Sequence, residues 1–177
     1  MNAQPPSLLY TGEVKNTPLG DLRVALSDRG LVAVTWDMTP ARFAEHLERR
    51  FKCPVQPDEE KTAEVARQLR EYLNGERREF TIPIDWSFLR PFQRKVLQAT
   101  FAIPYGATRT YGDLAFEVTG NRRAARAVGR AEATNPMPLV IPCHRVIGAN
   151  GKLIGYGGGE GLKTKEWLLK LEGAVLT

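Results

Sequence analysis

Apolar and polar residues alternate in two short segments near the start of the chain. In residues 22–26 (Leu-Arg-Val-Ala-Leu) and again in residues 31–36, every second side chain falls on the same face. The residues between them, 27–30 (Ser-Asp-Arg-Gly), favour a turn. This pattern predicts an antiparallel hairpin.

Helical spacing follows the hairpin. Thr39 and Pro40 supply a cap and a first-turn proline for a helix over residues 41–51, and Asp58 opens a second helical pattern. Residues 78–86 are predicted to form a further strand. The N-terminal part, residues 1–86, is therefore predicted to be a small α/β domain, an antiparallel sheet with helices, that acts as a scaffold.

Helical spacing dominates from residue 87 onward. A helix over residues 92–101 is followed by one over residues 110–118, which Thr110 and Asp113 open as a capping pair. After a break at Gly120, a third helix covers residues 122–134. Two short helices across a glycine turn predict a helix-turn-helix in a mainly helical domain over residues 87–177.

The last of these helices is rich in arginine and alanine. Its arginines are Arg122, Arg123, Arg126 and Arg130, and its alanines include Ala124, Ala125, Ala127 and Ala131. Small side chains would let the helix backbone approach DNA while arginines supply charge, but a solvated basic face explains the composition equally well. The net charge of +5 favours an acidic partner without requiring one.

Cys143 stands out as a candidate nucleophile. It follows the apolar run 139–141, predicted to be a buried strand or extended segment, and Pro142 fixes the approach to it. Positive charge from His144 and Arg145 is expected to lower the thiol pKa, whereas an inert buried cysteine is the alternative interpretation. His144 can act as a base through a water, because neighbouring side chains on an extended segment point apart.

Cysteine and histidine usage argues against a metal or a disulfide framework. The chain has two cysteines, Cys53 and Cys143, and two histidines, His46 and His144, without metal-ligand spacing. We therefore expect no metal and no cofactor. The first residues lack the pattern of a secretory signal, and no apolar run is long enough to span a membrane, so we expect a cytoplasmic protein, nucleoid-associated in a prokaryote.

The run Asn135-Pro136-x-Pro138-x-x-Ile141-Pro142-Cys143-His144-Arg145-Val146 is highly specific. With residues 126–129 upstream and 156–159 downstream, it resembles the O6-alkylguanine-DNA alkyltransferases. The resemblance implies a ribonuclease H-like N-terminal domain and a winged helix-turn-helix C-terminal domain. It also implies direct, irreversible and stoichiometric DNA repair, in which an alkyl group moves from O6-alkylguanine to a protein cysteine. O4-alkylthymine as a second substrate is left open.

The resemblance also assigns catalytic roles. By similarity, Cys143 accepts the alkyl group from a flipped-out base, His144 takes the thiol proton through a water, and Glu172 orients His144. Tyr111 helps to turn the nucleotide out and donates a proton toward the guanine. Asn135 braces the segment that carries Cys143.

The same resemblance assigns contacts to DNA. Arg126 would fill the gap left by the extruded base, with the helix in the minor groove of double-stranded DNA and no sequence preference. The expected DNA contacts are Arg122, Arg123, Ala124, Arg126, Ala127 and Tyr111. The expected substrate pocket is formed by Val146, Tyr156, Gly157 and Gly158. We expect a monomer.

Departures from the family pattern and rival functions remain. The zinc ligands that several relatives carry in the N-terminal domain are missing, Glu132 stands where some have an apolar residue over the base, and Gly157 replaces a serine. The size of the alkyl group that fits is therefore open.

Three other functions compete with alkyl transfer. They are a damage-binding module, a helix-turn-helix regulator, and a cysteine hydrolase using Cys143, His144 and Glu172. Sequence-specific DNA binding would favour the regulator, and multiple turnover on an ester would favour the hydrolase.

Overall fold

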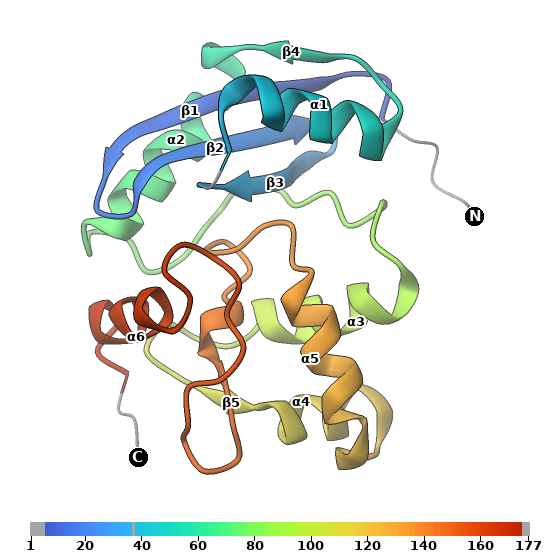
Figure 1. The fold of residues 1–177 in the computed structure, drawn as a ribbon, viewed down its shortest axis with the longest axis vertical. Coiled ribbons are helices and arrows are strands. Elements are labelled where there is room, and N and C mark those ends of the chain that lie inside the picture. Colours follow the sequence, from blue (N-terminus) through green and yellow to red (C-terminus); the bar gives the residue numbers. More distant parts are fainter. Residues whose placement is uncertain (1–5, 37, 175–177) are drawn as a thin grey trace. The chain divides into compact units, whose positions relative to one another are not determined.

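The computed structural model describes residues 6–36 and 38–174, and it divides between Phe88 and Leu89 into two compact units (Figure 1). The ends of the two predicted domains, residues 1–5 and 175–177, and residue 37 lie outside the described residues. No helix in the described ranges is long and apolar enough to cross a membrane.

The first unit is built on a mixed sheet of four strands in the order β3-β2-β1-β4. Its strands are β1 Leu9–Thr17, β2 Gly20–Ser27, β3 Gly30–Thr35 and β4 Val55–Pro57. The predicted hairpin of β2 and β3 is confirmed, and β1 is also antiparallel to β2. The short strand β4 runs parallel to β1, so the sheet is not purely antiparallel as predicted.

Helices α1 (Pro40–Phe51) and α2 (Glu59–Leu73) cover opposite faces of this sheet (Figure 1). Leu9 of β1 packs in one core cluster with Phe43 and Leu47 of α1. Gly12 faces the other way, because strand side chains alternate, and a Cβ built on it would lie 2.0 Å from Thr62 Oγ1 of α2. Glycine at this position therefore allows α2 to approach the strand closely.

Both predicted helix caps of this unit are confirmed. The Thr39 side chain accepts from the backbone N–H of Arg42, and the Asp58 side chain accepts from that of Lys61. Each cap satisfies an N–H group that has no partner inside its helix.

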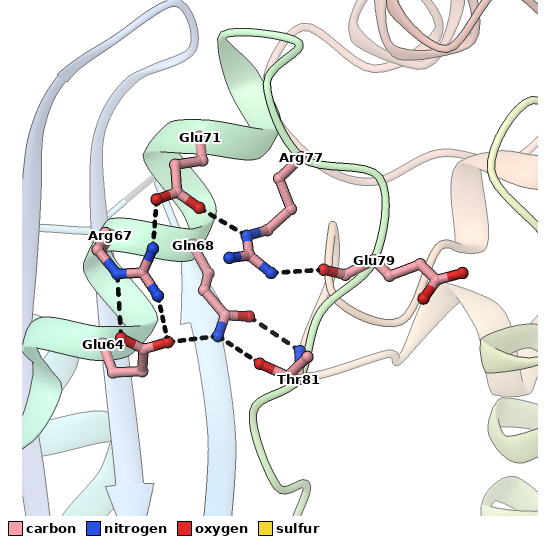
Figure 2. Close-up of polar contacts among 7 residues, drawn as sticks. All are labelled: Glu64, Arg67, Gln68, Glu71, Arg77, Glu79 and Thr81. Carbon is pink, nitrogen blue, oxygen red and sulfur yellow. Dashed lines mark hydrogen bonds and ion pairs between the residues drawn. The ribbon is translucent and has the colours of Figure 1, made fainter.

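The predicted strand over residues 78–86 is wrong. Only an isolated parallel bridge joins Ile84 to Leu31, and Pro83 has no N–H with which to continue a ladder. Side chains of α2 hold the segment instead (Figure 2). The buried Gln68 amide donates to Thr81 Oγ1 at 2.7 Å and accepts from the Thr81 backbone N–H at 2.9 Å.

The second unit is mainly helical. Its elements are α3 Pro91–Phe101, β5 Arg109–Thr110, α4 Tyr111–Thr119, η1 Arg122–Ala124, α5 Ala125–Ala133, η2 Cys143–Arg145, β6 Val146–Ile147 and α6 Leu162–Leu171, where η marks a 3₁₀ turn. Val96 of α3, Leu114 of α4, Val128 of α5 and Val146 of β6 share one buried cluster. These helices and the strand β6 are thereby packed around a single core.

The predicted helix-turn-helix is confirmed in α4 and α5. Thr110 and Asp113 form a complete capping box at the start of α4, and Gly120 ends this helix with a φ of 73°. The second helix begins later than predicted, because residues 122–124 form a 3₁₀ turn before α5.

The predicted strand or extended segment at residues 139–141 is wrong. These residues are fully buried, but they form turns, and Leu139 has a φ of 73°. The backbone N–H of Ile141 donates to the Met137 carbonyl at 2.9 Å, and η2 begins two residues later. Apolar composition alone cannot distinguish a buried turn from a buried strand.

The contacts of Gln68 generate a stability prediction. Gln68→Ala is expected to lower the free energy of unfolding by about 2–4 kcal/mol, because it opens a small cavity and leaves polar groups around Thr81 without partners. Arg67→Ala, which removes only exposed ion pairs on the same helix, should cost less than about 1 kcal/mol. Urea denaturation measures both, and equal losses would contradict the structural role given to Gln68.

Candidate active site

A short parallel strand pair positions the candidate site. Residues of β5 and β6 pair as Arg109 with Val146 and Thr110 with Ile147. Tyr111 begins α4 directly after β5, and the η2 turn with Cys143 lies directly before β6. The pair therefore brings the first turn of α4 next to the turn that carries the thiol.

Asn135 braces the chain ahead of Cys143. Its Nδ2 donates to the Ile141 carbonyl at 2.9 Å, and its Oδ1 accepts from the Met137 backbone N–H at 3.0 Å. The Cys143 backbone N–H in turn donates to the Ile141 carbonyl at 2.8 Å. One side chain thus ties together both ends of the buried turn, at the place where the resemblance put it.

The Glu172 carboxylate joins His144 and Arg145. His144 Nε2 lies 2.8 Å from Glu172 Oε1, and Arg145 Nε and Nη2 each donate to the carboxylate at 2.9 Å. Burial raises the pKa of Glu172, but the bonds from His144 and Arg145 outweigh it and hold this pKa at about 2. The contact of Glu172 with His144 is the one expected, whereas the fork from Arg145 was not.

These bonds fix the state of His144. Its burial lowers the imidazole pKa more than Glu172 raises it, so the ring is neutral at neutral pH. An ionised carboxylate only accepts hydrogen bonds, so the single ring proton lies on Nε2. Nδ1 is then the basic nitrogen.

Cys143 is buried, and its pKa is raised rather than lowered. Desolvation is the main cause, the charge of Glu132 adds to it, and Asn135 and Lys165 oppose it, which leaves the thiol pKa at about 12. The expectation that His144 and Arg145 would lower this pKa is wrong, because His144 is neutral and the Arg145 guanidinium is bonded to Glu172. The resting sulfur is therefore a thiol.

Tyr111 and Lys165 share carbonyl groups of the glycine-rich segment. Tyr111 Oη donates to the Ile154 carbonyl at 3.1 Å, and Lys165 Nζ donates to the same carbonyl at 2.8 Å and to that of Val146 at 2.5 Å. Burial raises the pKa of Tyr111 and lowers that of Lys165 to about 8. Lys165 thus ties the segment to β6, beside Cys143.

Sequence reasoning missed Lys165. The residue lies three and four positions before Leu168 and Leu169 on α6, and all three side chains are fully buried. That spacing places a residue on the inner face of a helix, so the signal was present.

The residues of the predicted substrate pocket are only partly brought together. Val146 is buried next to the Cys143 turn, and the Tyr156 hydroxyl is buried, which raises its pKa. Gly158 is half-buried. Gly157 is exposed, and a Cβ built on it would meet no heavy atom of the described chain within 4 Å.

Five of the six predicted DNA-contact residues lie on η1 and α5, and the sixth, Tyr111, begins α4. Arg123, Arg126 and Ala127 are exposed, and Ala124 is half-buried. Arg122 is exposed but bonded, since its Nη1 donates to Asp113 of α4 at 2.7 Å. This ion pair ties the turn between the two helices together.

Within residues 6–36 and 38–174, no three His, Cys, Asp or Glu side chains gather in a way that could hold a metal ion. Glu172, the carboxylate in contact with His144, is already paired with Arg145.

Both units of the chain match known protein families. Residues 9–86 match the family described as the 6-O-methylguanine DNA methyltransferase ribonuclease-like domain, and residues 91–174 match its DNA binding domain. These matches agree with the predicted ribonuclease H-like domain and helical DNA-binding domain.

Individual relatives are similar over nearly the whole chain. A methylated-DNA–protein-cysteine methyltransferase of Methanosarcina acetivorans is 41% identical, over 89% of this chain and 95% of its own. The constitutive enzyme of Bacillus subtilis is 40% identical, over 88% and 91%. The crystal structure of the Mycobacterium tuberculosis protein OGT in complex with DNA has a TM-score of 0.74 and 37% identity, and covers 94% of this chain and 92% of that one.

The depressed pKa of Glu172 generates a prediction on acid stability. Because the carboxyl has a lower pKa folded than unfolded, its contribution is complete above its ordinary pKa of 4.5 and is lost as pH falls through about 2. The difference corresponds to roughly 3 kcal/mol. Urea denaturation of the unaltered chain and of Glu172→Gln over this pH range should show that the variant lacks this loss.

At neutral pH the same variant should be less stable by about 3–5 kcal/mol, because Arg145 keeps a buried charge without its carboxylate. Glu160→Gln, on an exposed side chain, serves as the control. An unchanged pH dependence in Glu172→Gln would show that the carboxylate does not hold the site together.

Proposed function

Since the chain belongs to the 6-O-methylguanine DNA methyltransferase family, we infer that Cys143 is the cysteine that accepts the alkyl group in its reaction. The protein binds DNA and repairs it by alkyl transfer to a cysteine. Of its two cysteines, Cys53 packs in the apolar cluster under α1, while Cys143 lies in the DNA-binding domain beside Tyr111 and His144. This placement is the observation that carries the proposal.

The proposed substrate is O6-alkylguanine turned out of double-stranded DNA. The Cys143 sulfur attacks the alkyl carbon, a carbon–sulfur bond forms, and the bond from that carbon to O6 breaks with its electron pair going to the guanine. The thiol proton passes through a water to Nδ1 of His144, and Tyr111 supplies a proton to the guanine. The thioether is stable, so each molecule reacts once.

The resting charges support this sequence of events. A neutral His144 can take up a proton, and the ionised Glu172 at 2.8 Å then stabilises the imidazolium that forms. The raised pKa of Tyr111 keeps its proton on the phenol until a base is present. The raised pKa of Cys143 means that the thiol must be activated at the moment of reaction.

DNA contact is proposed for the exposed side of α5 and the turn before it. Arg126 would enter the base stack where the nucleotide leaves, and Arg122 and Arg123 would lie along the phosphates. The small side chains of Ala124 and Ala127 would allow close approach in the minor groove, without sequence preference. We propose a monomer that works in the cytoplasm, on the nucleoid in a prokaryote.

Intact-mass spectrometry tests the acceptor. Incubation with a duplex containing O6-methylguanine should add the mass of one methylene group per protein, located on Cys143 by peptide mapping. Cys143→Ala should stay unmodified, and Cys53→Ala should react like the unaltered chain. Tight DNA binding with no gain of mass in the unaltered chain would instead favour a damage-binding protein.

Tyr111→Phe tests the proton donor. Loss of the phenol proton is expected to slow transfer by about 10²-fold, since general acids commonly contribute that much or more. Fluorescence anisotropy should show little change in DNA affinity, and Tyr10→Phe in the first unit should react at the original rate. Full-speed transfer by Tyr111→Phe would remove Tyr111 from the mechanism.

A further inference from the structure

Glu132 is a buried carboxyl that the proposed mechanism does not use. It lies near the end of α5 and is 5% exposed. Its Oε1 contacts the Thr100 hydroxyl of α3, while its Oε2 is buried without a hydrogen-bond partner in the described part of the chain. A charge in this position would be poorly compensated, so burial favours the neutral acid.

The bonds of Thr100 also fit a neutral Glu132. The Thr100 hydroxyl lies 3.0 Å from the Val96 carbonyl as well as against the carboxyl, yet it has one proton to donate. If Glu132 is protonated, it donates to Thr100 Oγ1, and Thr100 donates to Val96. Consistent with this arrangement, burial raises the pKa of Glu132 to about 7, against the effects of Thr100 and Lys165.

Glu132 faces the groups of the active site. Gly129, one turn earlier on α5, lies against Tyr111, since a Cβ built on it would be 3.9 Å from the ring. Residues three apart share a helix face, so Glu132 points toward the same region. Its ionised form raises the pKa of Tyr111 on α4 and of Cys143 in η2. Lys165 of α6 is the cation that faces it.

We propose that Glu132 modulates how readily Cys143 reacts: the ionised carboxylate adds to the opposition that burial offers to ionisation of the neighbouring sulfur, and the neutral acid removes this added opposition. The inference rests on the proposed role of Cys143 as alkyl acceptor. In this proposal Glu132 acts through the sulfur, which makes it a positioning residue.

A distinctive pH profile follows. In the proposed mechanism the thiol proton moves to His144 and stays in the site, so without a titrating neighbour the rate of transfer would not change with pH. In this chain the proton lost near neutrality leaves Glu132 first, and the new negative charge then opposes ionisation of Cys143. The rate of transfer therefore falls as pH rises through about 7 and then stays at a lower value.

The rate of methyl transfer, measured by intact mass at saturating O6-methylguanine duplex, tests the proposal across about pH 6 to 9. The ratio of the Glu132→Gln rate to that of the unaltered chain should grow by about tenfold between pH 6 and pH 8.5. Glu166→Gln is the matched control, because it removes the same charge from a partly exposed position on α6. Its ratio should not depend on pH.

A Glu132→Gln ratio that is constant with pH would overturn the proposal. If this variant does not fold, the unaltered chain decides: a fall of its rate centred near pH 7 supports the role of Glu132, and a rate that does not fall until Lys165 titrates near pH 8 rejects it. Failure of the proposed function looks different, because Cys143 of the unaltered chain would then gain no methyl group at any pH.

Discussion

The second unit depends on the contacts that the Glu172 carboxylate makes with His144 and Arg145. It compensates the buried guanidinium of Arg145 and fixes the ring of His144, and it connects the end of α6 to the turn that carries Cys143. In a medium of low polarity such a charge is tolerated only with its partners in place. The geometry around the thiol therefore depends, together with the strand pair β5–β6 and Asn135, on the contacts of this one carboxylate.

Around this pair, three groups of the proposed reaction rest uncharged. Burial keeps Cys143 as a thiol, Tyr111 as a phenol and His144 as a neutral imidazole. In the proposed reaction, charge develops as the carbon–sulfur bond forms, next to a histidine whose ionisation Glu172 favours.

Much of the fold follows from local signals in the sequence. The caps at Thr39, Asp58 and Thr110 and the turn before Gly30 use contacts between near neighbours, and the sequence therefore predicts them. The family motif around Cys143 is likewise contiguous, so the sequence alone identifies it. Strand β4 and the turns at residues 139–141 depend on partners far along the chain, which a periodic pattern cannot reveal.

The same division holds for the site. The contact of His144 with Glu172 could be expected from the family resemblance, whereas the raised pKa of Cys143 could not, since it comes from burial and from Glu132. Lys165 and the pairing of Thr100 with Glu132 likewise involve side chains that only the folded unit brings together.

The position of Glu172 also bears on how the protein is made. Glu172 and Arg145 are 27 residues apart, and Arg145 emerges from the ribosome first. Until α6 docks, the guanidinium has no carboxylate and cannot be buried at acceptable cost, so the turn with Cys143 stays open. The first unit, which is synthesised earlier, contains none of these groups and can fold before them. The reactive centre thus takes shape only after α6 has been synthesised.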